Sequence, residues 1–334
     1  MRLVTYEIKT ALGRTQRLGA LIGDRVVDLH FAYAWLLSSE GEAQPYRVAE
    51  AIVPSDMTAF LQMGERAMDA ARRTLAAIAH APLEGPREER LWHPLAEVRL
   101  LAPLTHPNSL RDFYAFEQHV KTGFAKRGEE IPPEWYELPV YYKGNARTML
   151  GPDAEIPWPR YTKLLDFELE LACVIGREGR DIQVEEAYKY VAGYMVMNDV
   201  SARDIQRKEM KLRLGPAKAK DFATVIGPTL VTADEIGDVR DLPMAVRVNG
   251  ETWSEGNAGS SYWSFAQMIA HASMDETLYP GDILGSGTVG RGCGLELDRW
   301  IQPGDLVELE IGGLGILRNR VGNPTGAPVP ALGG

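Results

Sequence analysis

Two glutamates, Glu168 and Glu170, lie one residue apart in the otherwise apolar run 167–175. In a β-strand, side chains alternate between the two faces, so both carboxylates would share one face and the large apolar side chains the other. If that face is buried, the carboxylates repel each other and are costly to desolvate unless a cation joins them. The spacing therefore indicates a divalent-metal site. The alternative is an antiparallel strand whose glutamates meet solvent.

Two aspartates elsewhere in the chain are candidates for further metal ligands. Asp112 lies in the segment 111–120, and Asp199 lies directly before a predicted helix at 201–211. Carboxylate oxygens with spare positions for water suit Mg²⁺ or Ca²⁺ better than Zn²⁺, which prefers Cys and His. The acidic residues therefore predict a site for a hard cation.

A general base could stand beside such an ion. The segment 111–122 is predicted to be a helix, in which Asp112 and His119, seven residues apart, fall on nearly the same face. Such a helix could place a carboxylate ligand and a base along one wall of a cleft. The alternative is that His119 is a surface histidine or one with satisfied hydrogen bonds.

Cationic and amide side chains follow the second aspartate. Arg203 and Gln206, three residues apart, share a face near the positive end of their predicted helix. They could donate hydrogen bonds to an oxyanion beside a metal held by Asp199. The alternative is a capped, solvated amphipathic helix. Further on, Lys218 and Lys220 alternate after a turn, so only one of them need point inward.

The segment 285–290, Gly-Ser-Gly-Thr-Val-Gly, formally matches a dinucleotide-binding fingerprint. We reject that interpretation, because residues 291–294 continue as a glycine-rich loop and no βαβ unit surrounds it. Two interpretations remain: a structural turn between strands, or a loop whose backbone N–H groups and Thr288 hydroxyl hold a carboxylate.

The elements expected around these residues define an α+β fold that is mostly β. Residues 1–30 indicate a small β meander, residues 56–79 a helical tract, and the proline-rich residues 80–110 a crossover to a second domain. Beyond the crossover, strands dominate. The helices expected there lie near 111–122, 184–191, 201–211 and 262–273. We therefore predict a small N-terminal domain at 1–100 and a catalytic domain at 101–334.

Turn signals support the strands of the second domain. Asn249-Gly250, between two alternating runs, is a strong signal for a two-residue hairpin. Pro280-Gly281 and Pro303-Gly304 each precede an apolar run and fit the central positions of a type II turn.

Composition excludes several classes of protein. With 45% hydrophobic and 25% charged residues the chain is an ordinary globular protein, and its net charge of −10 argues against a nucleic-acid surface. Cys173 and Cys293 are its only cysteines, so no disulfide framework is expected. No stretch indicates a signal segment or a membrane span. These features predict a cytoplasmic protein without membrane or nucleic-acid partners.

In order along the chain, the motifs resemble the fumarylacetoacetate hydrolase family. They are Asp-Phe-Tyr with a downstream Gln-His, Pro-Val-Tyr-Tyr, Asp-Phe-Glu-Leu-Glu, Asn-Asp-Val-Ser-Ala-Arg-Asp-Ile-Gln, Leu-Gly-Pro followed by Lys-Asp-Phe, and Gly-Ser-Gly-Thr. The resemblance spans about residues 108 to 312. It implies a mixed β-sandwich roll as the C-terminal domain, a small α/β N-terminal domain, and a homodimer.

The resemblance also implies a role for each site residue. As metal ligands for Mg²⁺, Ca²⁺ or Mn²⁺ it implies Asp112, Glu168, Glu170 and Asp199, with Lys220 and Thr224 near the ion. As catalytic residues it implies the base His119, Glu296 that orients it, and Arg203, Gln206 and Lys220. As substrate-binding residues it implies Tyr114, Arg127, Tyr142 and Thr288; the match at Arg127 is one residue short in spacing from His119.

The activity that this resemblance implies is hydrolysis of a carbon–carbon bond in a 2,4-dioxo acid, fumarylacetoacetate or a related acylpyruvate, in aromatic catabolism such as tyrosine degradation. The presence of both His119 and Glu296 favours hydrolysis, which needs an activated water. Val200 and Lys143 differ from the animal hydrolases, as does a lid-like segment at 127–137, and all lie around the substrate mouth. Two alternatives stay open. One is an isomerase or decarboxylase of the family acting on a hydroxydienedioate or oxaloacetate-like acid, and the other is a metal-binding scaffold without turnover.

Overall fold

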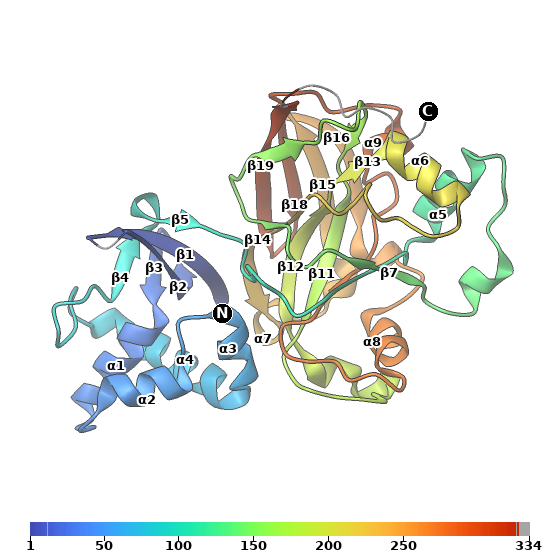
Figure 1. Cartoon of the computed structure of the whole chain (residues 1–334). Helices are drawn as coiled ribbons and strands as arrows, with labels where there is room; N and C mark the ends of the chain where they lie inside the picture. Colours follow the sequence, from blue (N-terminus) through green and yellow to red (C-terminus); the bar gives the residue numbers. More distant parts are fainter. Residues whose placement is uncertain (12, 325, 327–334) are drawn as a thin grey trace.

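Strands are the dominant elements of the chain, and most of them join one sheet (Figure 1). The structure is a computed structural model that describes residues 1–11, 13–324 and 326. The large sheet contains β1 (Arg2–Thr10), β2 (Gly13–Ile22), β3 (Arg25–Asp28), β4 (Trp92–Pro94), β5 (Arg99–Leu100), β6 (Leu110–Phe113), β7 (Tyr141–Gly144), β8 (Met149–Leu150), β11 (Leu169–Ile175), β12 (Val191–Asp199), β14 (Thr224–Thr232) and β17 (Ile283–Gly285). Its order is β4-β3-β2-β1-β14-β12-β11-β17-β6-β7, with β5 beside β1 and β8 beside β14.

A second sheet packs against the first. It has the order β16-β15-β18-β19-β9. Its strands are β9 (Ile156–Trp158), β15 (Pro243–Val248), β16 (Glu251–Asn257), β18 (Leu306–Ile311) and β19 (Gly315–Pro324), and a separate small pair is formed by β10 (Leu165–Asp166) and β13 (Ser201–Ala202). Leu171 and Val196 of the large sheet share one buried hydrophobic cluster with Val246 and Leu309 of the second. This hydrophobic core therefore lies between the large sheet and the second sheet.

Helices cover the opposite face of the large sheet near the N-terminus. The helices are α1 (Leu29–Ser39), α2 (Pro45–Ile52), α3 (Met57–Gln62), α4 (Glu65–Ala77), α5 (Glu117–Ala125), α6 (Arg203–Lys211), α7 (Ala233–Ile236), α8 (Phe265–Ser273) and α9 (Gly294–Leu297), and the 3₁₀ helices are η1 (Ile78–His80), η2 (Leu95–Glu97), η3 (Pro133–Tyr136), η4 (Val184–Tyr190), η5 (Val239–Asp241) and η6 (Ala258–Ser260). Ala172 and Val174 of β11 pack in one cluster with Leu29 of α1 and Phe60 of α3. Strand β11 is therefore buried on both faces.

The predicted N-terminal elements are present, with one difference. Strands β1 to β3 form the expected meander. The helical tract expected at 56–79 is two helices, α3 and α4, because Gly64 between them has a φ of 62°, which a helix cannot contain. The Asp56 side chain caps α3 by accepting the N–H of Ala59 at 2.8 Å.

The meander is joined to the rest of the chain through the sheet itself. Strand β1 pairs antiparallel with β14, and Arg2 lies opposite Val231. Backbone hydrogen bonds thus connect the region 1–100 to the region 101–334, and the division of the chain at residue 100 stays a prediction. Among the described residues, no helix is long and apolar enough to cross a membrane.

The turns predicted in the second half are confirmed. Strands β15 and β16 form a hairpin in which Asn249 and Gly250 both have positive φ, as a type I′ turn requires. Gly281 and Gly304, two residues before the starts of β17 and β18, also have positive φ, as the third position of a type II turn requires.

The helix predicted at 111–122 is partly wrong. Residues Leu110–Phe113 form strand β6, which pairs with β17 in parallel and with β7 antiparallel, and α5 begins only at Glu117. Asp112 and His119 therefore do not share a helix face. The sheet partners of β6 come from later in the chain, so the local pattern could not reveal them.

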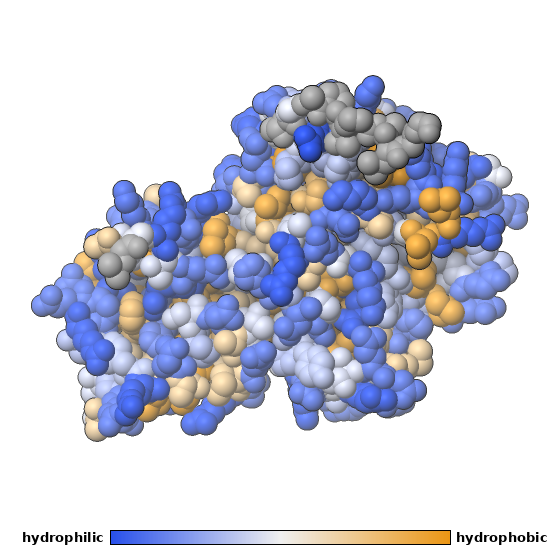
Figure 2. All heavy atoms as spheres, viewed as in Figure 1, coloured by the Kyte–Doolittle hydropathy of each residue, from blue (hydrophilic) through white to orange (hydrophobic). Residues whose placement is uncertain are grey.

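Hydrophobic side chains gather on the surface beside α6 (Figure 2). The end of α6 and the turn that follows carry Met210, Leu212 and Leu214, of which the last two are 80% and 85% exposed. Contiguous exposed apolar side chains are typical of contact surfaces. The homodimer stays a prediction.

Candidate active site with an acidic cluster

Three carboxylates meet where neighbouring strands of the large sheet end. Asp112 lies on β6, Glu170 on β11 and Asp199 at the end of β12, and one oxygen from each lies within 4.8 Å of the others. All three residues are at most 3% exposed. Glu168 is also buried, so the alternative of solvated glutamates is wrong. The predicted alternation is confirmed, because Glu168 and Glu170 continue the face of β11 opposite to Leu169 and Leu171.

The neighbouring β17 and its loop leave room for these acids and bind one of them. A Cβ at Gly285 would lie 2.4 Å from Oδ1 of Asp112, so only glycine leaves space for that carboxylate. The Gly287 N–H donates to Glu170 Oε2 at 3.1 Å and the Thr288 hydroxyl to Oε1 at 3.3 Å. The loop at 285–290 therefore does hold a carboxylate through a backbone N–H and a hydroxyl, and that carboxylate belongs to the protein.

Glu168 binds two buried cations instead of joining the three-acid group. Arg203 donates to its Oε1 at 2.7 Å, and Lys220 donates to its Oε2. Lys220 also bonds to Asp199, so it links Glu168 to the acidic cluster. Despite burial, which opposes ionisation, the charges of Arg203 and Lys220 lower the pKa of Glu168. The fourth predicted ligand thus lies at the edge of the cluster, within one charge network.

The electrostatics of the cluster fit a bound divalent cation. Burial and the charge of Asp199 raise the pKa of Asp112, while burial and the charge of Asp112 raise the pKa of Glu170. Oδ1 of Asp112 and Oδ1 of Asp199 are buried without a hydrogen-bond partner among the described residues. Unpartnered carboxylate oxygens that converge in a buried site are the donors that a hard cation prefers. The residues present therefore fit such an ion.

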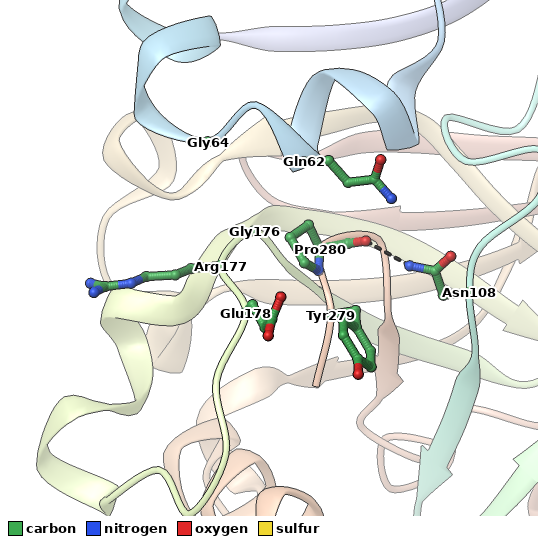
Figure 3. A pocket seen from close by; sticks show the side chains of 8 residues that line it. All are labelled: Gln62, Gly64, Asn108, Gly176, Arg177, Glu178, Tyr279 and Pro280. Atoms are coloured by element: carbon green, nitrogen blue, oxygen red, sulfur yellow. Dashed lines mark hydrogen bonds between the residues drawn. The ribbon is translucent and has the colours of Figure 1, made fainter. Parts of the chain in front are cut away.

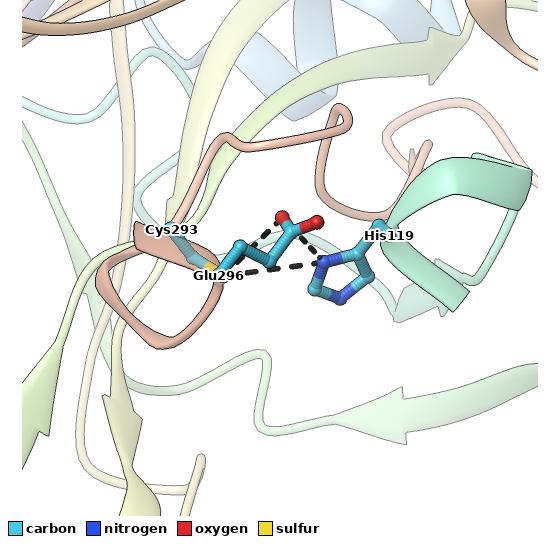
Figure 4. Close-up of side chains that lie close together, drawn as sticks. All are labelled: His119, Cys293 and Glu296. Carbon is cyan, nitrogen blue, oxygen red and sulfur yellow. Dashed lines mark hydrogen bonds and ion pairs between the residues drawn. The ribbon is translucent and has the colours of Figure 1, made fainter. Parts of the chain in front are cut away.

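A histidine and a glutamate form a pair beside this network (Figure 4). His119 of α5 and Glu296 of α9 join through Nδ1 and Oε2 at 2.9 Å. The other ring nitrogen, Nε2, lies 4.0 Å from Oε1 of Glu168 and so faces the charged network. Their side chains are 8% and 1% exposed. The predicted base and its orienting glutamate are therefore together in the structure.

Asp166, which was not among the predicted site residues, positions this pair. It accepts Nε–H of Arg203 at 2.8 Å and the backbone N–H groups of Gly294 and Leu295 at 2.8 and 2.9 Å. It thereby ties the arginine to the first turn of α9, which carries Glu296. A signal was present in the sequence, because Asp166 continues the every-second-residue pattern of Glu168 and Glu170.

The remaining predicted residues differ in how close they lie to the cluster. Tyr142 donates to Asp199 Oδ2 at 2.8 Å, and Gln206 accepts from Arg203 at 2.9 Å. The Tyr114 ring contacts His119 edge-on, with centroids 5.4 Å apart. Arg127 is not bonded to the cluster; its Nε donates to Glu129, and its side chain is 42% exposed.

Asp199 ends a strand instead of capping a helix. The chain passes from β12 through β13 before α6 begins at Arg203, which has no side-chain cap. The alternative of a helix start capped by a side chain is therefore wrong, and the Asp199 carboxylate lies with Asp112 and Glu170. Of the two alternating lysines, Lys220 points inward and Lys218 is exposed.

A surface cleft of about 590 Å³ lies away from these residues (Figure 3). Its lining residues are Gln62, Gly64, Asn108, Gly176, Arg177, Glu178, Tyr279 and Pro280. Gly176, Arg177 and Glu178 follow the end of β11, and Tyr279 and Pro280 precede β17. The acidic cluster lies at the opposite ends of these two strands, roughly 20 Å away at about 3.3 Å per residue. The cleft is therefore separate from the acidic site.

Residues 109–322 match the family described as fumarylacetoacetate (FAA) hydrolase C-terminal. The chain belongs to this family. The expected resemblance, and with it the α+β, mostly β fold, is thereby confirmed. The match includes every predicted site residue.

Relatives of this fumarylacetoacetate hydrolase family member catalyse more than one reaction. The chain is 34% identical to human mitochondrial oxaloacetate tautomerase FAHD2A, with 80% of each chain covered. It is 28% identical to the fumarylacetoacetase of Dictyostelium discoideum, with 84% of this chain and 78% of the relative covered. Family membership therefore indicates an enzyme but leaves the reaction open.

A solved structure shares the fold over nearly the whole chain. It is maleylpyruvate hydrolase from Sphingobium sp. SYK-6 in complex with manganese(II) and pyruvate, with a TM-score of 0.67 and 24% identity, covering 97% of this chain and 100% of the other. At this identity the likeness establishes the fold. That structure holds manganese(II). Among the described residues of this chain, two groups of side chains could hold a metal ion: the acidic cluster, and His119 with Cys293 and Glu296.

Proposed function

We propose that the protein is a metal-dependent hydrolase that cleaves a carbon–carbon bond in a 2,4-dioxo acid, with fumarylacetoacetate or an acylpyruvate as substrate. The observation that carries this proposal is the His119–Glu296 hydrogen bond beside a buried acidic cluster. A hydrolase needs a base that takes a proton from water, and the pair provides one with a fixed ring orientation.

Asp112, Glu170 and Asp199 would hold the cation, with Glu168 at their edge. Magnesium, manganese and calcium ions all suit an oxygen-only donor set. When bound, the ion supplies a Lewis acid for the oxygens of the dioxo acid. The cation also offsets the mutual repulsion of the three carboxylates.

His119 performs the proton transfers. Glu296 accepts the Nδ1–H, which leaves the lone pair of Nε2 available to a water molecule. As Nε2 takes a proton, the water oxygen attacks a substrate carbonyl carbon. The bond between this carbonyl carbon and the carbon next to it then breaks. The electron pair stays on that second carbon, which belongs to the departing keto acid, and the imidazolium returns the proton to it. Two acids result, so atoms and charge balance.

Arg203 and Lys220 stabilise the negative charge that develops in these steps. Both are buried, at 2% and 4% exposure, and both are held by Glu168. Cations fixed in a site with little water act strongly on an oxyanion because they need no reorganisation during the reaction. Gln206, bonded to Arg203, fixes the position of its guanidinium.

A second candidate function is tautomerisation of oxaloacetate or a related acid. It is favoured by the 34% identity to the human oxaloacetate tautomerase. A keto–enol shift moves a proton between carbon and oxygen and needs no attack by water. The same histidine could move that proton, so products must distinguish the two reactions.

The deciding experiment is a substrate panel with protein loaded with Mg²⁺ or Mn²⁺. Fumarylacetoacetate, fumarylpyruvate, acylpyruvates and oxaloacetate are each followed by loss of enol absorbance and by product identification, with a chelator control. Two acids from a dioxo acid, abolished by chelation, support the hydrolase. Enol loss from oxaloacetate without cleavage of any dioxo acid would replace it with the tautomerase.

Variants test the base. His119→Ala should lower hydrolysis at least 10²-fold, the lower end of what a general base contributes. The exposed His106 offers a matched control, and His106→Ala should keep the wild-type rate. Full hydrolysis by folded, metal-loaded His119→Ala would remove His119 from the mechanism. Cytoplasmic location and the small dioxo-acid partner stay predictions.

A further inference from the structure

The His119–Glu296 pair has a third member that the proposed hydrolysis does not use. Sγ of Cys293 lies 4.0 Å from Nδ1 of His119 and donates to Oε2 of Glu296 at 3.5 Å (Figure 4). Cys293 is fully buried. The other carboxylate oxygen, Glu296 Oε1, is buried and has no hydrogen-bond partner among the described residues, and the Glu296 side chain is 1% exposed. Sγ of Cys293, Nδ1 of His119 and Oε2 of Glu296 thus lie within 4.0 Å of one another, and Oε1 of the same carboxylate is left without a partner.

This donor set differs from the acidic cluster in the ion that it prefers. Thiolate, imidazole and carboxylate together favour Zn²⁺, whereas oxygen-only donors favour Mg²⁺, Mn²⁺ or Ca²⁺. Three protein ligands with a fourth position for water is a common zinc arrangement. The two groups of side chains therefore have different metal preferences, although they are connected through the contact between His119 and Glu168.

The distances are close to those of a zinc site. Tetrahedral zinc with Zn–S of about 2.3 Å and Zn–N and Zn–O of about 2.0–2.2 Å separates sulfur from the other donors by about 3.6 Å and nitrogen from oxygen by about 3.4 Å. The corresponding separations here are 4.0, 3.5 and 2.9 Å. Movements of about half an ångström by the three side chains would bring their donor atoms to the separations of a tetrahedral zinc site.

We propose that His119, Cys293 and Glu296 form a zinc site that switches the enzyme off. Nδ1 of His119, Sγ of Cys293 and a carboxylate oxygen of Glu296 bind the ion. The inhibitory consequence rests on the proposed role of His119 as the base, whereas the binding itself does not.

The proton balance explains the inhibition. The thiol proton of Cys293, which the buried S–H donates to Glu296 in the metal-free protein, is released to solvent when sulfur binds zinc. Nδ1 must offer its lone pair, so the single proton of the neutral ring moves to Nε2. An Nε2 that carries a proton cannot take one from water, and Glu296 no longer orients the ring. Zinc therefore blocks the base without occupying the acidic cluster.

Cobalt(II) spectroscopy tests the site directly. Protein whose acidic cluster is filled with excess Mg²⁺ is titrated with Co²⁺ as a probe for zinc, and thiolate ligation is read from the charge-transfer absorption in the near ultraviolet. Wild type should gain this band at one equivalent, and ZnCl₂ should remove it. Cys293→Ser should lack it. Cys173→Ala is the matched control, because Cys173 is equally buried but lies in the hydrophobic core, and it should keep the band.

Inhibition is measured in parallel, with each variant normalised to its own zinc-free rate. We expect Zn²⁺ to inhibit wild type and Cys173→Ala despite excess Mg²⁺, and Cys293→Ser to need at least 10-fold more zinc. If Cys293→Ser does not fold, Cys293→Ala serves instead. A band that persists without Cys293, or inhibition that excess Mg²⁺ fully relieves, would overturn the proposal. A zinc-sensitive band in a protein that cleaves no dioxo acid would support the site while rejecting the hydrolase.

Discussion

Replacing Asp112 by Asn should make the metal-free protein more stable while removing its response to metal. The reason is the crowding of three buried carboxylates whose ligand oxygens lie within 4.8 Å of one another. Two unit charges at 4.8 Å repel by about 3.5 kcal/mol at an effective dielectric constant of about 20. Because burial and the charge of Asp199 raise the pKa of Asp112, proton uptake relieves part of this cost. We expect a net gain of about 1–2 kcal/mol from Asp112→Asn.

The assay is thermal unfolding with and without added metal. For a chain of this size, 1 kcal/mol corresponds to about 2 °C, so metal-free Asp112→Asn should unfold about 2–4 °C above metal-free wild type. Saturating Mn²⁺ at about 100 times its Kd adds about 2.7 kcal/mol to wild type, or about 5 °C. The same addition should shift Asp112→Asn by less than about 1 °C.

Asp28→Asn is a control, because it should lower the stability that Asp112→Asn raises. The buried carboxylate of Asp28 is already satisfied, because it pairs with Arg17 and accepts the Tyr6 hydroxyl and the N–H of Phe31. Asp28→Asn should therefore cost about 2–4 kcal/mol, since it breaks a buried ion pair, and should keep the full metal shift. If Asp112→Asn were destabilised like Asp28→Asn and still responded to Mn²⁺, the acidic cluster would not be the cation site.

Three further predictions address the neighbouring features. Glu296→Gln should lower kcat by about 10²-fold with little change in KM, because a neutral amide does not stabilise the imidazolium that forms at His119 and does not touch substrate. Steady-state kinetics check this, and an equal change in both constants would contradict it. Lys220→Met should destabilise the metal-free protein by about 3 kcal/mol, because Glu168 loses a buried partner. Bound metal should recover part of this loss. Urea unfolding of the metal-free and the metal-loaded protein measures both effects. Asn249→Ala should cost about 1 kcal/mol, because alanine tolerates positive φ poorly, and a thermal shift below about 0.5 °C would argue against that cause.

Much of the site could be predicted from local sequence patterns. The shared face of Glu168 and Glu170 follows from the two-residue period of a strand, and Arg203 and Gln206 bond to each other as their helical spacing predicts. The hairpin at Asn249 depends only on which residues accept positive φ. Each of these features is fixed by neighbours in the sequence, so the sequence alone could predict it.

Features that depend on distant segments were not predictable in this way. Asp112 lies on a strand because β17 pairs beside it, and nothing within the segment 111–122 indicates that partner. Lys220 rather than Lys218 reaches Glu168, in a turn held by Glu209, which accepts the backbone N–H groups of Ala217 and Ala219. Cys293 and Glu296 lie at the start of α9, whose position is set by Asp166, which accepts the backbone N–H groups of Gly294 and Leu295.

The pairing of β6 with β17 has a consequence for how the chain folds. Ser109 and Asp282, which join at the start of these strands, are 173 residues apart in sequence. Closing so long a loop is entropically costly, and contacts of this range form late in folding. Asp112 cannot meet Glu170 before that closure, so a cation finds its complete set of ligands only when the sheet is assembled. Added metal should therefore slow unfolding and leave the folding rate almost unchanged, so the bound ion prolongs the lifetime of the native state without guiding its formation.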